Sequence, residues 1–225
     1  MGHWFEKYLV SMVSGFIGII FTLVGAGFLW GHSNTQNEIR LVEQIPLVTA
    51  TRLMDMSSDT SVAIEGRVSE RNTSHNGLVV YTIFQYRGYE CDDEDSNDCE
   101  EVWLQTERVT PALWLDLPDG RVRIGNNDYW AFHEPKKWQT TENLIEMETL
   151  EYRGFPIGSP VFVLGKVSKT DGVVLNADIL FGGSRQDYLD SQTEEANVLL
   201  LMGVVFGGFG LLFITIAIGT AIRMR

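Results

Sequence analysis

Two long runs without an ionisable residue constrain this chain more than any other feature. Leu9–Trp30 has 22 residues and Val198–Ile222 has 25, and neither contains Asp, Glu, Lys, Arg or His. At a rise of about 1.5 Å per residue, a helix of either length crosses the roughly 30 Å hydrocarbon core of a bilayer. We therefore predict transmembrane helices at 9–30 and 198–222, with short tails at 1–8 and 223–225. This excludes a freely soluble enzyme. Transport by this chain alone is also disfavoured, because ion and proton paths use ionisable groups within the membrane.

The first run could instead be the apolar region of a signal peptide, since a charged tail precedes it and small residues occur near its end at Gly25, Ala26 and Gly27. A signal peptide, however, has an apolar region of only about 7–15 residues. The length of the run therefore favours an uncleaved anchor.

The segment between the two runs is long enough for one domain and strongly acidic. Residues 31–197 carry 29 Asp and Glu against 14 Lys and Arg. Such a domain repels nucleic acid and anionic lipid surfaces, so we expect no nucleic-acid partner.

The few charges that flank the runs predict the orientation. Lys7 precedes the first run, and Arg223 and Arg225 follow the second. Two spans place both tails on one side, and the positive-inside rule makes that side cytoplasmic. The central domain is then expected in the periplasm or its topological equivalent.

The pattern of the central segment indicates a mainly β (α+β) domain inserted between the two helices. Strand-like alternation or β-branched and aromatic enrichment recurs along it, with turn signals at Asn76-Gly77, Pro118-Asp119-Gly120 and Asp171-Gly172. The expected strands are 61–70, 77–86, 102–109, 112–117, 160–167 and 173–181. Helical signal is confined to 51–57 and to 184–197, where Ser191 or Thr193 is expected to start a helix that continues into the second span.

The two cysteines, Cys91 and Cys99, enclose an acidic stretch. In an exported domain this spacing predicts a disulfide that closes the loop. A cation site is the alternative, because Asp93, Asp95 and Asn97 match the first three ligand positions of a calcium loop. Asp98 stands where that loop needs glycine, however, and Leu104 where it needs glutamate, so the EF-hand match fails. Zinc would lack ligands beyond the cysteines.

Glycines recur within both predicted spans. Gly203 and Gly207 form a G-x-x-x-G pair, and Gly15 and Gly18 lie in the first span. Small residues let helix backbones approach closely in lipid, so these positions are candidates for packing against other helices, including those of other membrane subunits. The alternative is that glycine is simply common in membrane helices.

Catalytic patterns are weak in this sequence. His133 beside Glu134 is the best single candidate for acid–base work, but no nucleophile, zinc-protease or phosphate-loop motif accompanies it. We therefore expect no enzymatic activity and no cofactor. Aromatic residues in the same region, above all Trp130, Phe132 and Trp138, suggest a face for a partner, with core filling as the alternative.

Several short motifs resemble the GIDE or BAM ("beside a membrane") domain. This domain occurs in membrane-anchored RING ubiquitin ligases of mitochondria and chloroplasts and in prokaryotic membrane proteins. The resemblance covers about residues 45–222 and rests on the segments 62–68 (VAIEGRV), 107–117, 148–158 (ETLEYRGFPIG), 161–165, 171–175 and 184–195, the last of which precedes the second span.

The resemblance implies a domain for interaction or sensing rather than catalysis. The paired zinc cysteines of a RING finger do not occur in this sequence, so ligase activity is not carried over. The resulting hypothesis is a non-catalytic accessory or scaffold subunit of a larger membrane complex. A stand-alone exported module that senses a metal or small ligand is the alternative, and a membrane-bound hydrolase is a third reading.

Overall fold

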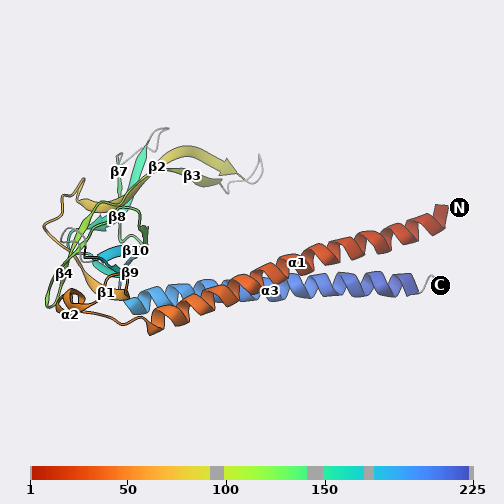
Figure 1. Cartoon of the computed structure of the whole chain (residues 1–225). Coiled ribbons are helices and arrows are strands. Elements are labelled where there is room, and N and C mark those ends of the chain that lie inside the picture. The colour runs from red at the N-terminus through yellow and green to blue at the C-terminus, as the bar shows by residue number, and fades with distance from the viewer. Residues whose placement is uncertain (1, 92–98, 141–148, 170–174, 223–225) are drawn as a thin grey trace. The chain divides into compact units, whose positions relative to one another are not determined.

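The computed structural model describes residues 2–91, 99–140, 149–169 and 175–222 (Figure 1). Two compact units make up the chain. One consists of Met1–Gln44 together with Leu189–Arg225, and the other is Ile45–Tyr188. A β-rich domain between two apolar helices is therefore confirmed. The compact β unit is shorter than the expected segment 31–197, because the residues at both ends of that segment are helical.

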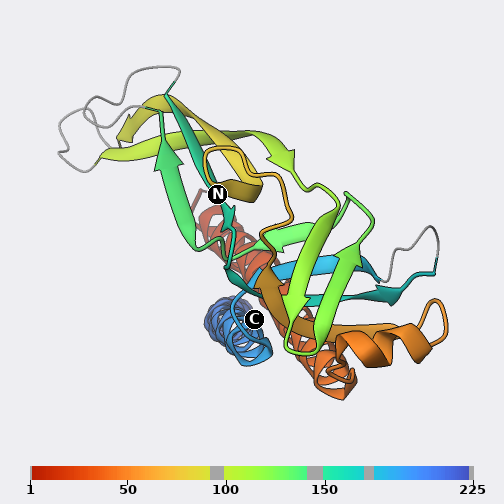
Figure 2. The same ribbon diagram turned by 90° about the vertical axis from the view of Figure 1, so that its left-hand side faces the viewer.

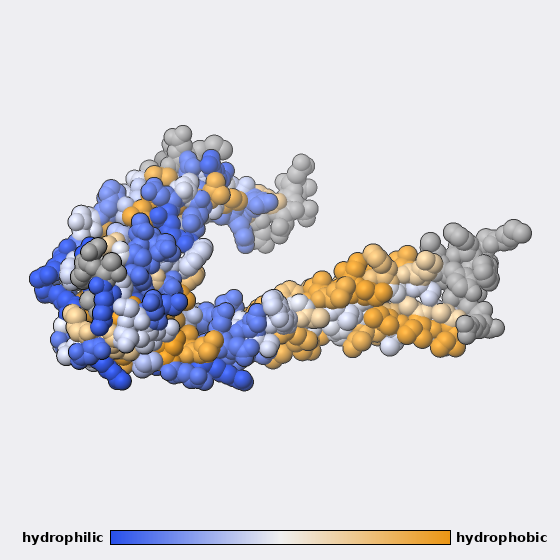
Figure 3. Space-filling view, viewed as in Figure 1, coloured by the Kyte–Doolittle hydropathy of each residue, from blue (hydrophilic) through white to orange (hydrophobic). Residues whose placement is uncertain are grey.

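The helical unit is built from α1 (Gly2–Gln44) and most of α3 (Arg185–Ile222). The portions Ser11–Gln44 and Arg185–Ile222 are each long and apolar enough to cross a bilayer. Both helices continue beyond the uncharged runs into polar sequence. Among the coloured residues of Figure 3, each helix has one stretch of apolar side chains and one stretch that is mainly hydrophilic.

The start of α3 differs from the sequence-based expectation at Ser191 or Thr193. The helix begins at Arg185 because Asp187 caps it: its carboxylate accepts bonds from the Ser184 backbone N–H and hydroxyl, both at 2.7 Å. Ser184 Oγ in turn accepts from the Asp187 N–H at 3.2 Å. A reciprocal cap of this kind satisfies first-turn donors, and the expectation overlooked it because the downstream glutamates were the stronger composition signal.

A closed barrel forms the larger part of the β unit. Its strands are β1 (Ser61–Val68), β4 (Leu113–Leu117), β5 (Gly120–Ile124), β9 (Pro160–Val167) and β10 (Leu175–Gly182), in the order β5-β4-β1-β9-β10. A parallel pairing of Leu175 with Ile124 closes the ring. Next to this pair, the Asn126 side chain accepts the Ala177 N–H at 2.8 Å and donates to the Ala177 carbonyl at 2.6 Å. The amide side chain thus replaces backbone hydrogen bonds at Ala177, beyond the end of β5.

The barrel interior contains the hydrophobic core. Alternate strand positions point inward, and these carry mainly branched aliphatic residues that fit a pleated surface. Members of this core with no exposed surface include Val62, Ile64, Leu113, Leu115, Val122, Ile124 and Leu175. The short helix α2 (Ala50–Asp55) adds Leu53 to this core, and Thr49 caps its N-terminus.

A second sheet adjoins the barrel. It contains β2 (Leu78–Cys91), β3 (Cys99–Val109), β7 (Lys136–Gln139) and β8 (Leu150–Pro156), in the order β3-β2-β8-β7. In Figure 2 the yellow-green hairpin of β2 and β3 extends away from the barrel strands. Among the described residues of this sheet, Val79, Val80 and Phe155 belong to the barrel core, while most residues of β3 and β7 are exposed. The remaining strand, β6 (Trp130–Phe132), pairs in parallel with β10.

Two backbone features explain local geometry. Asn76 and Gly77 have φ of 52° and 77°, and His75 and Leu78 exchange two backbone hydrogen bonds, which confirms the expected Asn-Gly turn. A β-bulge interrupts the pairing of β9 with β10 between Ala177 and Ile179. There, Gly165 is required because a Cβ would lie 2.2 Å from the Asn176 carbonyl oxygen. The expected turn at Asp171-Gly172 lies outside the described residues.

Candidate interaction surface

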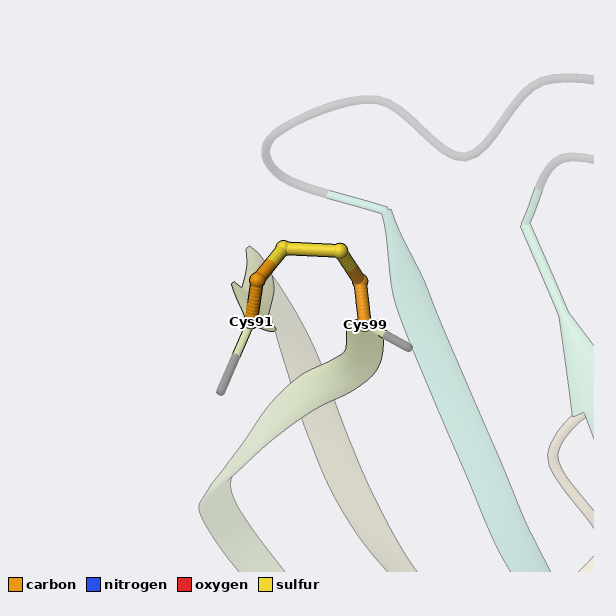
Figure 4. Close-up of a disulfide and its surroundings, with 2 residues drawn as sticks. All are labelled: Cys91 and Cys99. Carbon is orange, nitrogen blue, oxygen red and sulfur yellow. A yellow bond between two sulfur atoms is a disulfide. The ribbon is translucent and has the colours of Figure 1, made fainter. Parts of the chain in front are cut away.

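The disulfide between Cys91 and Cys99 closes the far end of the β2–β3 hairpin (Figure 4). The two cysteines are directly opposed in the strand pairing, and their Cα atoms are 4.2 Å apart. The candidate cation ligands Asp93, Asp95 and Asn97 lie outside the described residues. Within the described part of the chain, no three His, Cys, Asp or Glu side chains are grouped as metal ligands.

Glycines hold α1 and α3 in close contact. A Cβ on Gly25 would lie 2.5 Å from the Gly207 backbone nitrogen, and one on Gly18 would lie 2.9 Å from the Gly210 carbonyl oxygen. In the other direction, a Cβ on Gly203 would lie 2.8 Å from Leu29. Within this chain, the helix that approaches Gly203 is therefore α1.

The remaining two glycines singled out from the sequence contribute differently. Gly15 faces Ala217, whose Cβ would be 3.6 Å from a Cβ at Gly15, which is ordinary contact. Gly207 meets Gly25 through its backbone, while its own Cβ would enter open space. Polar and aromatic contacts also join α1 to α3. The Ser11 hydroxyl donates to the Ala217 carbonyl at 2.9 Å, and the Phe21 and Phe206 rings stack with their centroids 5.6 Å apart.

The three aromatic residues expected to form one partner face occupy two places. Trp130 and Phe132 lie on β6, are 54% and 44% exposed, and stack with ring centroids 6.2 Å apart. Trp138 lies on β7, is 36% exposed, and packs edge-on against Tyr152 at 5.1 Å. Trp138 is thus part of a separate cluster with Tyr152, Tyr81 and His75.

Cations cover aromatic rings on one side of the second sheet. The Arg108 guanidinium lies 4.1 Å from the centre of the Trp130 ring, and the Arg153 guanidinium 4.4 Å from that of Phe84. Lys137 Nζ lies 5.8 Å from the centre of the Trp103 ring. In such contacts the aromatic ring covers one side of the cation. The N–H groups that point away from the ring remain available as hydrogen-bond donors.

A fully buried carboxylate, Glu151, organises part of this surface. Its oxygens accept bonds from Lys137 Nζ and Arg153 Nε, each at 2.5 Å, and from Gln139 Nε2 at 2.8 Å. Burial alone would raise the pKa of Glu151, but the hydrogen bonds from Lys137, Gln139 and Arg153 outweigh it and lower that pKa. Glu151 therefore stays charged and anchors the two cations, which makes its role structural.

The sequence did not indicate this cationic surface. Arg108, Lys137 and Arg153 lie far apart in the sequence, on three different strands. Strand alternation could have shown which face each residue occupies, but not that β3, β2, β8 and β7 are neighbours in that order.

His133, the candidate acid–base residue, follows β6 in the left-handed region with φ of 58°. Its ring stacks on Phe181 with centroids 5.1 Å apart. Bonds from Ser184 lower the pKa of Asp187, and the charge of His133 adds to that effect. Asp187 bonds Ser184 at the start of α3, so its interaction with His133 supports the N-terminus of that helix. The contacts described for His133 place no nucleophilic side chain beside it, and the Ser184 hydroxyl belongs to the helix cap.

An open cleft of about 570 Å³ lies between β1, β4 and the start of α3. Its charged side chains are already engaged: Glu65 accepts the Arg185 N–H at 2.7 Å, and Arg67 donates to the Gly158 carbonyl at 3.0 Å. Asp116 pairs with Arg121 at 2.6 Å. The cleft thus lacks a free acid–base pair among its described residues.

Comparison with known protein families, curated proteins and solved structures finds no match for this chain.

Proposed function

We propose that this protein is a non-catalytic accessory or scaffold subunit of a membrane complex. Its two helices anchor it in the bilayer, and its β domain presents a docking surface to another protein. The observation that carries the proposal is the exposed stack of Trp130 and Phe132, beside which Arg108 lies. Tryptophan and arginine are among the residue types enriched in the energetically dominant parts of protein interfaces.

The helical unit supports an anchoring role. Its glycine contacts join α1 to α3, and within the two uncharged runs the exposed side chains are mainly apolar. The uncharged runs contain no Asp, Glu, Lys, Arg or His with which to conduct ions or protons. A helix pair of this kind can fix a domain at a membrane surface without a transport function.

The proposed orientation places the β domain on the non-cytoplasmic side. Lys7, Arg223 and Arg225 support cytoplasmic tails by the positive-inside rule. The Cys91–Cys99 disulfide agrees with an oxidising compartment. A GIDE-like domain would have the same location beside a membrane and the same interaction role.

Isolation of the full chain from its native membrane tests this function. We expect another membrane protein to co-purify at a fixed ratio in polymer-bounded nanodiscs, measured by quantitative mass spectrometry. Trp130→Ala should reduce that ratio strongly, because loss of a central interface tryptophan typically weakens binding by about 2 kcal/mol, or roughly thirtyfold.

Tyr89→Ala is the matched control. Tyr89 is 62% exposed on the same domain, but it lies near the disulfide end of β2 and contacts Tyr86 rather than Trp130. Loss of the partner in both variants, or in neither, would contradict the assignment of the interface to Trp130.

A further inference from the structure

Three of the cations on the second sheet form a single row across its four strands. Thr82 of β2 is paired with Arg108 of β3 on one side and with Arg153 of β8 on the other, and Arg153 is paired with Lys137 of β7. Residues paired across neighbouring strands point to the same face. Arg108, Arg153 and Lys137 therefore project together from one side of the sheet.

This row is unusual in an acidic domain, because among the described residues its three cations outnumber the acidic side chains beside them. Phe84, Glu151 and Gln139 form the adjoining row, in which Glu151 is the acidic member. Glu101 lies farther along the hairpin and accepts the Trp103 indole N–H at 2.9 Å. Among the described residues, Glu151 neutralises one of the three cations, which leaves about two positive charges on the row.

The donors of this row are incompletely used. Lys137 and Arg153 keep 52% and 41% of their side chains exposed while they bond Glu151. Arg108 Nε is buried and has no hydrogen-bond partner among the described residues, although its guanidinium stacks on Trp130. A buried donor without a partner is unfavourable, so Arg108 would gain from a shift of its side chain that brings the guanidinium to an acceptor on a ligand.

We infer that this row binds an acidic peptide segment of the partner protein, with Arg108 as its main contact and Trp130 and Phe132 as an apolar anchor beside it. The inference rests on the proposed function and names the chemistry of the partner. Guanidinium groups bind carboxylates through paired, charge-assisted hydrogen bonds. A short segment reaches this row, whereas an extended anionic surface such as a bilayer or nucleic acid meets the net negative charge of the whole domain.

Fluorescence anisotropy tests the inference directly. The full chain, in nanodiscs of zwitterionic lipid, is titrated against a rhodamine-labelled peptide of sequence Glu-Glu-Phe-Glu-Glu-Leu-Glu and against its Lys-for-Glu counterpart. We expect the acidic peptide to bind and the basic one not to bind. Raising the salt from about 0.05 to 0.5 M should weaken binding, because exposed charges are screened.

Arg108→Gln should weaken binding of the acidic peptide about tenfold, and Arg108→Lys should restore part of it. Arg121→Gln is the matched control: it removes the same charge, but Arg121 is paired with Asp116 on the barrel. Equal losses in the Gln variants at 108 and 121 would show a net-charge effect and overturn the inference. So would the absence of peptide binding at millimolar concentration, or Arg108-dependent binding of phosphatidylglycerol vesicles in its place.

These outcomes separate the inference from the proposed function. If a partner co-purifies with the native chain but the acidic peptide does not bind, only the acidic-segment inference fails. If the peptide binds through Arg108 but no partner co-purifies, the accessory role fails and the row is a binding site with another use.

Discussion

Gly25→Ala should separate the two helices, because it places a methyl group where there is no room. The new Cβ would lie 2.5 Å from the Gly207 nitrogen, 2.8 Å from its Cα and 3.0 Å from the Gly203 carbonyl oxygen. All three are backbone atoms of α3, so no side-chain rotation can relieve the overlap. The helices must move apart along this part of the α1–α3 contact.

The size of the effect follows from these distances. Ordinary contact begins at 3.4 Å, so the backbones must separate by about 0.9 Å at this point. Overpacking of this size typically costs about 1–3 kcal/mol. Alanine also favours the helix by up to about 1 kcal/mol relative to glycine, which acts in the opposite direction.

Gly27→Ala controls for that opposing term, because Gly27 is on the same helix and a Cβ there meets no atom within 4 Å. Steric trapping, with biotin tags on α1 and α3, measures the free energy of separating the helices in a bilayer. We expect Gly25→Ala to be less stable than Gly27→Ala by about 1–3 kcal/mol. Equal values for the two variants would refute the packing shown between Gly25 and Gly207.

Three further changes test the β domain. Asp119→Asn should destabilise it at neutral pH, since the Asp119 carboxylate accepts the Ala50 and Thr51 N–H groups and these bonds hold its pKa far below the usual range. The stabilisation from the Asp119 carboxylate is fully present above the pKa of the unfolded chain, and it is lost as the pH falls toward the lower pKa of the folded protein. Urea melts from pH 7 to 2 should therefore show a smaller acid-induced loss of unfolding free energy in the variant than in the wild type. Glu151→Gln should lower the free energy of unfolding by about 1–3 kcal/mol in the same melts, because two cations lose a buried charged acceptor; an unchanged midpoint would contradict that role. Alkylation without reductant should modify neither cysteine, and replacing both with serine should speed amide exchange at the ends of β2 and β3 while leaving barrel exchange unchanged. Stoichiometric labelling of both thiols would contradict the disulfide.

Much of the architecture could be predicted because it depends on local patterns. The helices follow from uncharged runs too long for ordinary soluble helices, and several strands follow from alternation at period two. The turn at Asn76-Gly77 was predictable because its backbone conformation suits those two residues. The strands β5, β6, β7 and β8 were not among the expected strands. Glycine or charged residues interrupt the patterns of β5, β7 and β8, and β6 has only 3 residues.

The candidate surface was predictable only in part. Trp130 and Phe132 stood out as aromatic residues, and they do meet. The separation of Trp138 from them, and the alignment of Arg108 with Arg153 and Lys137, depend on strand order and register. Long-range pairing of this kind leaves no signal in a single sequence. The approach of α1 to Gly203 was not predictable for the same reason, because a glycine pattern shows that a helix can approach but not which one.

The mass of the particle released from native membranes tests the central claim most directly. Native mass spectrometry of nanodiscs purified through this chain should give an assembly heavier than the 25.4 kDa chain by the mass of at least one different membrane polypeptide. A particle of 25.4 kDa, or of whole multiples of that mass, would contradict an accessory role in a larger complex.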